Sequence, residues 1–171
     1  MSLMKASWSI SLPDLSGASE EEHFAPLVWM LEGMITVNMH IIRWAFRRGT
    51  PIPPVYASGV VYREDPAGQE NWKDCLAIMQ DRFGDCDRLV AWRTAELRVA
   101  GIAAEPAIKW QHIPYEVAIS LKKPDGTPMF PAAMVPREGL WLVHCGVKWP
   151  GGQIEDISKN LGMGGQYLGG V

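Results

Sequence analysis

The sequence predicts a single α+β domain in which a helical N-terminal half packs on an antiparallel β-sheet. Apolar residues recur at three- and four-residue steps in residues 19–48 and again in residues 86–100, which is typical of helices with one buried face. After residue 104 the pattern changes to short β-forming runs separated by Pro and Gly. A chain of 171 residues has the size of one domain, 1–171, and can bury about 70% of its unfolded surface without a metal or a disulfide.

Composition excludes several classes of partner. The net charge of −3 argues against nucleic-acid binding, and the only basic cluster reads as a solvated helix end: Arg43, Arg47 and Arg48. Three cysteines without a C-x-x-C spacing favour a reducing, cytoplasmic location over a disulfide framework. The first residues do not show the charged and then apolar pattern of a signal peptide, and no run of eighteen apolar residues occurs, so neither a signal peptide nor a membrane partner is expected.

The N-terminal region, residues 5–48, predicts a strand followed by the longest helix. Alternating residues in Lys5–Leu12 indicate a half-buried strand, and Ser19–Arg48 predicts the central core helix. Pro26 would kink this helix, so its regular part is expected to begin nearer Ala25. A shorter helix is predicted at Trp72–Phe83.

The stretch Gly84-Asp85-Cys86-Asp87 places a thiol at the start of the helix 86–100. Asp85 can act as N-cap, and Gly101 suits the position after the last turn. Cys86 then lies in the first turn, where free backbone N–H groups and the positive end of the helix dipole favour a thiolate. The position predicts a nucleophile.

A base and its orienting group are predicted on the hairpin 139–158. His144 lies in the β-forming run Leu140–Trp149, and Pro150-Gly151-Gly152 separates this run from a second one that carries Asp156. Because side chains alternate along a strand, His144 and Asp156 share a face only if the loop holds an odd number of residues. We expect an odd loop with glycine in the left-handed conformation, which would put the two side chains opposite or diagonal.

This order of Cys, His and Asp is similar to the transglutaminase-like branch of the papain-type cysteine enzymes. More narrowly, three segments resemble the small transglutaminase-like cysteine peptidases of bacteriophages and prophages: Pro53–Tyr62, Gly84–Arg93 with Ala95–Arg98, and Trp149–Met163. The resemblance implies a papain-like fold, with Cys86 as nucleophile, His144 as general base and Asp156 as its orienting partner. It also implies that no cofactor or metal is needed.

A papain-like site also needs donors for the oxyanion. The backbone N–H of Cys86 is one, and the candidates for the second are Trp72, Gln69 and Gln80. His112 is a rival base, ranked second because no carboxylate follows it at hairpin spacing. Cys75 and Cys145 are expected to be buried small hydrophobes, with Cys145 facing away from His144.

The C-terminal half contains further expected elements. Glu105–His112 and Glu116–Lys122 predict strands, and the Pro-containing segment Phe130–Gly139 predicts a loop. This loop either borders a substrate groove, which is the preferred interpretation, or is plain surface. Residues 162–171 contain five glycines and predict a loosely held tail.

The expected reaction is acyl transfer through a thioester, most simply hydrolysis of a peptide or amide bond in a peptide or protein substrate. A lysine-type amine in place of water would give cross-linking. One alternative is a non-catalytic phage structural or assembly protein on the same fold, with other phage proteins as partners. A weaker alternative is a zinc site made by the three cysteines and His144. The identity of the substrate does not follow from the sequence.

Overall fold

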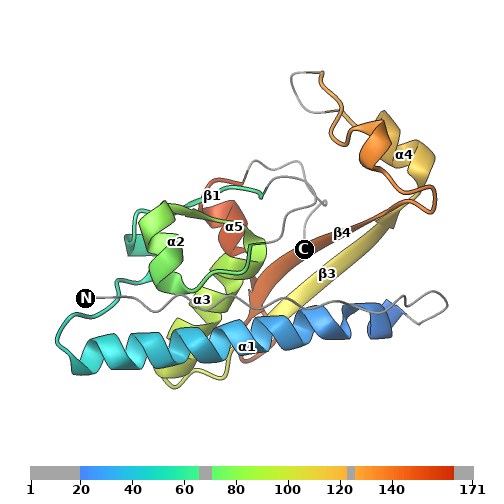
Figure 1. Ribbon diagram of the computed structural model, residues 1–171. Coiled ribbons are helices and arrows are strands. Elements are labelled where there is room, and N and C mark those ends of the chain that lie inside the picture. Colours follow the sequence, from blue (N-terminus) through green and yellow to red (C-terminus); the bar gives the residue numbers. More distant parts are fainter. Residues whose placement is uncertain (1–19, 66–70, 123–125, 164–171) are drawn as a thin grey trace.

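The computed structural model describes residues 20–65, 71–122 and 126–163, and its architecture is α+β (Figure 1). The strand expected at Lys5–Leu12, the candidate Gln69 and most of the glycine-rich tail lie outside the described residues. The helices are α1 (Glu20–Arg47), α2 (Cys75–Asp81), α3 (Cys86–Val99), α4 (Tyr115–Ser120) and α5 (Ile157–Asn160), with 3-10 turns η1 (Val55–Ala57) and η2 (Ala132–Met134). The strands are β1 (Val61–Tyr62), β2 (Phe83–Gly84), β3 (Glu105–Ile113), β4 (Leu140–Lys148) and β5 (Ile154–Glu155).

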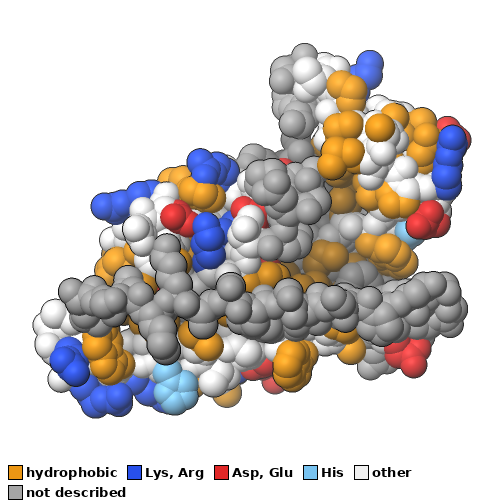
Figure 2. Space-filling model, in the orientation of Figure 1, with side chains coloured by type: hydrophobic (Ala, Val, Ile, Leu, Met, Phe, Trp, Pro, Cys, Tyr) orange, Lys and Arg blue, Asp and Glu red, His pale blue; other side chains and the backbone are white. Residues whose placement is uncertain are grey.

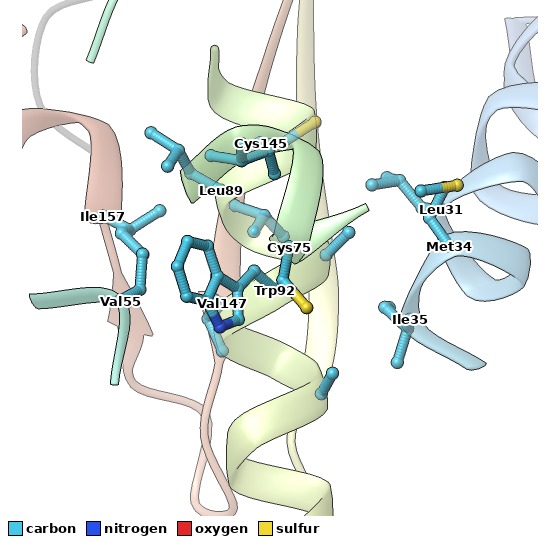
Figure 3. Close-up of a cluster of buried hydrophobic side chains, with 14 of the residues drawn as sticks. Leu31, Met34, Ile35, Val55, Cys75, Leu89, Trp92, Cys145, Val147 and Ile157 are labelled. Atoms are coloured by element: carbon cyan, nitrogen blue, oxygen red, sulfur yellow. The ribbon is translucent and has the colours of Figure 1, made fainter. Parts of the chain in front are cut away.

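The most buried helix is α3. Asp85 is its N-cap and Gly101, with φ +84°, follows its last turn, as the sequence predicts. Trp92 is fully buried near the middle of α3, between side chains of α1 on one side and of η1 and α5 on the other (Figure 3). The core side chains labelled around it are Leu31, Met34, Ile35, Val55, Cys75, Leu89, Cys145, Val147 and Ile157. This core fixes the direction of α3 and hence the position of its first residue.

The helix α1 lies on the outside of this core, which corrects the prediction that it is the central helix. Leu31 and Ile35 are fully buried against the core, but Trp29 is 68% and Phe46 is 74% exposed. The helix also begins at Glu20 and continues through Pro26, so the expected later start is wrong. The fixed φ of proline is compatible with a helix, and here the loss of one backbone hydrogen bond does not end it.

Residues Ala25–Arg47 of α1 are long and apolar enough to cross a membrane, judged by length and composition alone. The same test is passed by core helices of soluble proteins. Asn38 is fully buried in α1, where its Oδ1 accepts a hydrogen bond of 2.9 Å from the backbone N–H of Cys75. This contact ties α1 to α2, and the expected absence of a membrane partner stays a prediction.

The helix α2 is shorter than the predicted Trp72–Phe83. Asp74 caps its start, and Arg82 adopts a left-handed conformation, φ +67°, that ends it after Asp81. The chain then enters β2, which pairs in parallel with β1 and leads directly into α3. A two-stranded pair therefore holds the approach to Cys86.

The main sheet has the order β3-β4-β5 and is antiparallel. The paired strands β3 and β4 project away from the helices as a ribbon that carries α4 at its far end (Figure 1). A second, smaller hydrophobic cluster forms there around Ile113, Ala118 and Val135, and apolar side chains gather on this end in Figure 2. We call the far end of β3 and β4, together with α4, the arm. It contains its own small core, separate from the one around α3.

The strand predicted at Glu116–Lys122 is wrong, because Tyr115–Ser120 forms the helix α4. Pro114 is the N-cap, and Glu116 places a negative charge in the first turn, where the helix dipole favours it. Ala118 is fully buried in the second cluster. Burial of one face in this cluster decides the structure of a segment whose local pattern is ambiguous.

Candidate active site

Cys86 is the first residue of α3 and is half-buried. The backbone of Asp85 occupies the N-cap position, but its side chain makes no capping hydrogen bond. Its Oδ1 instead accepts a hydrogen bond of 2.7 Å from Nε of Arg88. Burial favours the neutral acid, but hydrogen bonds with Asp87 and Arg88 outweigh it, so the pKa of Asp85 lies below its usual value.

Arg88 lies beneath the nucleophile with only 1% of its side chain exposed. Besides Asp85 it binds Asp65, whose Oδ1 accepts from Nη2 at 2.7 Å. Oδ2 of Asp65 accepts from the backbone and side-chain amides of Asn71. This network joins the loop after β1 to the start of α3, and it neutralises the carboxylate next to Cys86.

The hairpin of β4 and β5 has the predicted odd parity. Val147 pairs with Glu155 and Lys148 with Ile154, so the five residues 149–153 connect the strands. Gly151 and Gly152 have φ values of +97° and +92° in this turn. Continued by one residue, this register puts Asp156 opposite Gly146, diagonal to His144 and on the same face.

His144 and Asp156 are in contact, with 3.2 Å between Nε2 and Oδ2. Oδ1 of Asp156 accepts from the backbone N–H of Lys159 at 3.0 Å and caps α5. Gly146 is required here, because a Cβ at that position would come within 2.9 Å of Ile154. The close approach of β5 to β4 brings the carboxylate to the ring, and it leaves Nδ1 of His144 as the ring nitrogen that can exchange a proton with a thiol.

The thiol of Cys86 interacts with both His144 and Cys145. A hydrogen bond with the Cys145 side chain is the largest cause that lowers the pKa of Cys86; burial opposes it, and the hydrogen bond and charge of His144 add to it. The resulting pKa is about 5. Consecutive side chains leave opposite faces of a strand, so a sulfur reached by both lies beside the edge of β4.

Cys145 is therefore a part of the site that the sequence did not indicate. It is buried, as expected, but the alternation of side chains predicted that it would point away from the His144 chemistry. The pKa of Cys145 is raised, first by its hydrogen bond with Cys86 and then by burial. Cys145 therefore stays a neutral S–H donor beside the Cys86 sulfur.

The pKa of the His144 imidazole is shifted in the opposite direction, upward. The hydrogen bond with Cys86 raises the pKa of His144, burial opposes this, and the charges of Cys86 and Asp156 raise it further. A lowered thiol pKa beside a raised imidazole pKa favours a thiolate–imidazolium pair near neutral pH. This arrangement can attack a carbonyl carbon and return a proton to a leaving group.

A second network holds β5, the strand that directly precedes Asp156. The neighbouring Glu155 accepts from Nε of Arg93 at 3.1 Å and from Nε1 of Trp149 at 2.7 Å. Its carboxylate also accepts from the hydroxyl of Tyr56. Arg93 stands seven residues after Cys86, on the same face of α3. The network thus ties β5 to the helix that carries the nucleophile.

The oxyanion candidates differ in their positions. Trp72 is half-buried and packs against the core cluster that Cys86 also touches. Gln80 is exposed on α2, and no interaction with Cys86 or His144 is found for it in the part of the chain that the structure describes. Gln69 lies outside that part. Of the two described candidates, only Trp72 is packed against the main core, and the backbone N–H of Cys86 stays the expected first oxyanion donor.

The other candidate base, His112, lies away from Cys86 and His144. His112 is exposed in the arm, where its Nε2 is 2.9 Å from the carbonyl oxygen of Glu138 and its ring packs against Trp141. Burial, and then the charge of Asp74, raises the pKa of Cys75 to about 12, which keeps that thiol protonated. Within residues 20–65, 71–122 and 126–163, no group of three or more His, Cys, Asp or Glu side chains is arranged to hold a metal ion. The zinc alternative gains no support from these residues.

Comparison of the chain with protein-family models, with curated proteins and with solved structures gives no match in any of the three. The similarity to the phage transglutaminase-like peptidases therefore stays a prediction made from the sequence.

Proposed function

We propose that this protein is a thiol-dependent acyl-transfer enzyme of the transglutaminase-like, papain-like type, and that it hydrolyses a peptide or amide bond. The observation that carries the proposal is the convergence of three separate segments on one thiol. The start of α3 supplies Cys86, β4 supplies His144, and the residue after β5 supplies Asp156 in contact with the imidazole. The opposite pKa shifts of Cys86 and His144 support a reactive ion pair.

In the first half of the reaction, the Cys86 thiolate attacks the carbonyl carbon of the substrate. The carbonyl oxygen takes the negative charge and is met by the backbone N–H of Cys86. The C–N bond then breaks as the His144 imidazolium gives its proton to the departing amine. A thioester on Cys86 and a neutral imidazole remain.

In the second half, the imidazole takes a proton from water and the resulting hydroxide attacks the thioester. The C–S bond breaks, the acid leaves, and the thiolate–imidazolium pair is restored. Asp156 does not exchange a proton in these steps; it holds the ring and stabilises its charged form. An amine in place of water would give an amide and make the protein a cross-linking enzyme.

The substrate is proposed to be a peptide or protein, by analogy with the phage and prophage peptidases that the sequence resembles. The competing proposal is a phage structural or assembly protein that keeps the fold without turnover. The two differ in whether the thiolate forms and resolves an acyl intermediate. They can be separated without the natural substrate.

The test uses p-nitrophenyl acetate as an acyl donor. The wild-type protein should release p-nitrophenol continuously and carry a transient acetyl group on Cys86, located by mass spectrometry. Cys86→Ala should abolish both, His144→Ala should lower the rate on the order of a thousandfold, and Cys75→Ala should change neither. Adding cadaverine and assaying for its acetyl amide distinguishes transfer from hydrolysis.

A rate for the wild-type protein no higher than that of Cys86→Ala would exclude the enzyme and favour the structural role. Circular dichroism of each variant shows whether the fold is intact. Asp156→Asn provides a graded control, because it preserves shape while removing the charge beside the imidazole.

A further inference from the structure

Two thiols from separate elements meet at the candidate active site, and the acyl-transfer steps use only one of them as nucleophile. Cys86 opens α3, Cys145 lies in β4, and both are free. Their side chains share a hydrogen bond. Cys86 also packs against the core cluster that contains Cys145, and Figure 3 shows Cys145 at the level of Leu89, one helical turn after Cys86. Two thiols in contact can form a covalent bond with each other, which a single thiol cannot.

The two thiols differ in their access to solvent. Cys86 is half-buried, whereas only 1% of Cys145 is exposed. A small dissolved oxidant such as hydrogen peroxide therefore reaches the Cys86 sulfur first. Charge favours the same order, because peroxides oxidise exposed thiolates faster than protonated thiols, and Cys145 keeps its proton while Cys86 loses its own.

Oxidation of Cys86 changes the state of Cys145. The pKa of Cys145 is raised first by its hydrogen bond with Cys86, then by burial and by the charge of Cys86. A sulfenic acid at position 86 is neutral, so the contribution of that charge ends once the acid forms. The Cys145 thiol then loses its proton more easily and becomes a better nucleophile, held beside the oxidised sulfur.

The third cysteine provides a control within the same chain. Cys75 is also free and buried, and it also follows the N-cap of a helix. Burial is the largest cause of its raised pKa, and the carboxylates that act on its thiol are those of Asp74 and Glu96. Its thiol is therefore neither an early target of peroxide nor a partner of the pair in β4 and α3.

We propose that Cys86 and Cys145 form a peroxide-responsive thiol pair, in which a peroxide oxidises Cys86 and Cys145 then closes a reversible disulfide with it. The disulfide itself does not depend on turnover of a substrate. The consequence that it switches off acyl transfer rests on the proposed function, because a Cys86 sulfur in a disulfide cannot attack a carbonyl carbon.

In the first step, the Cys86 thiolate attacks one oxygen of hydrogen peroxide and the O–O bond breaks. The departing hydroxide takes the proton of the His144 imidazolium and leaves as water, so that a sulfenic acid stands beside a neutral imidazole. In the second step, the Cys145 sulfur attacks the Cys86 sulfur and the S–O bond breaks. The Cys145 proton leaves with the hydroxyl group as a second water, and the two sulfurs have together given two electrons to the peroxide.

The test treats the purified protein with a small excess of hydrogen peroxide and then alkylates the remaining thiols with N-ethylmaleimide in denaturant. Mass spectrometry of the wild-type protein should find a Cys86–Cys145 disulfide, with only Cys75 alkylated. Acyl transfer from p-nitrophenyl acetate should fall at least about tenfold after oxidation and return after reduction with dithiothreitol, measured once the reductant has been removed.

Cys145→Ser is the decisive variant, because its hydroxyl keeps a donor beside Cys86 but cannot form a disulfide. In this variant Cys86 should proceed to the sulfinic acid, a gain of about 32 Da that dithiothreitol does not reverse. Cys145→Ala, which also lacks the second thiol, should give the same product. Cys75→Ala should form the disulfide as the wild-type protein does. Thermal unfolding verifies that each variant is folded.

A wild-type protein that gives the Cys86 sulfinic acid as fast as Cys145→Ser, without a disulfide, would overturn the thiol pair and leave the acyl-transfer proposal standing. A disulfide that joins Cys86 to Cys75 or to a second protein molecule would do the same. A Cys86–Cys145 disulfide in a protein that shows no acyl transfer even when reduced would support the pair and overturn the proposed enzyme. A Cys86 that stays a thiol under peroxide would overturn both proposals.

Discussion

The helices α2 and α3 begin in the same way, yet their first residues have opposite chemistry. Cys75 follows the N-cap Asp74, and Cys86 follows the N-cap Asp85. Burial and the charge of Asp74 raise the pKa of Cys75 to about 12. The pKa of Cys86 is lowered to about 5, first by its hydrogen bond with Cys145 and also by His144.

The two thiols differ in pKa because different side chains surround them. The side chain of Asp74 accepts from the backbone N–H groups of Leu76 and Ala77 at 2.9 and 3.0 Å, which uses the donors of the helix start and leaves a negative charge beside Cys75. Asp85 is paired with Arg88 instead. A helix N-terminus therefore does not by itself make a thiolate; the neighbours of Cys86 on β4, Cys145 and His144, lower its pKa.

The largest expected effect comes from Arg88→Met, which would leave Asp85 uncompensated and make the start of α3 resemble that of α2. Because the Arg88 pairs are buried, the loss should cost about 3–5 kcal/mol of unfolding free energy. It should also raise the pKa of Cys86. Chemical denaturation measures the first effect, and the pH dependence of thiol alkylation measures the second.

Lys73→Met is the matched control, because its pair with Asp81 has the same 2.7 Å distance but is about one-third exposed. Its loss should cost no more than about 1 kcal/mol. Equal destabilisation by the two substitutions would show that the buried network has no special role.

The next largest effect is expected from replacing Cys145, whose S–H group on β4 donates to the Cys86 sulfur. Cys145→Ala should raise the pKa of Cys86 toward the ordinary cysteine value of about 8.5, since it removes the largest lowering contribution. Cys145→Ser keeps a donor and should retain most of the lowering. A Cys86 alkylation profile that is the same in all three proteins would contradict the role given to Cys145.

The smallest effect is expected at α2. Asp74→Asn removes the charge beside Cys75 but not its burial, which is the larger cause of the raised pKa. The pKa of Cys75 should therefore fall only slightly, and the thiol should remain unreactive at neutral pH. Fast labelling of Cys75 in this variant would mean that the carboxylate, not burial, keeps it protonated.

Much of the site could be predicted from local pattern. The helix start at Cys86 follows from Asp85 and Gly101, and the parity of the β4–β5 loop follows from the alternation of strand side chains. Other features depend on tertiary contacts that local sequence does not contain. The Asp–Cys pairs at α2 and α3 are locally alike, and only the fold places one of them against His144 and Cys145.

The wrong predictions have the same origin, because they too concern tertiary contacts that local sequence does not contain. Alternation along β4 predicted that Cys145 faces away from the chemistry, which holds for the faces of the sheet but not for a sulfur at its edge. The apolar face of α1 predicted a central helix, but periodicity shows that a face is buried and not how many neighbours surround the helix. At α4, burial of Ala118 overrides a pattern that also fits a strand.

The pH dependence of Cys86 alkylation by iodoacetamide, resolved by mass spectrometry from that of Cys75 and Cys145, tests the central claim most directly. Thiolate forms as the pH rises through the pKa, so the Cys86 rate should rise with a midpoint of about 5 and stay high through neutral pH, while Cys75 and Cys145 remain slow. A second change in rate is expected above pH 6.5, where the imidazolium with its raised pKa loses its proton. A Cys86 midpoint near 8.5, or labelling no faster than that of Cys75, would contradict the account.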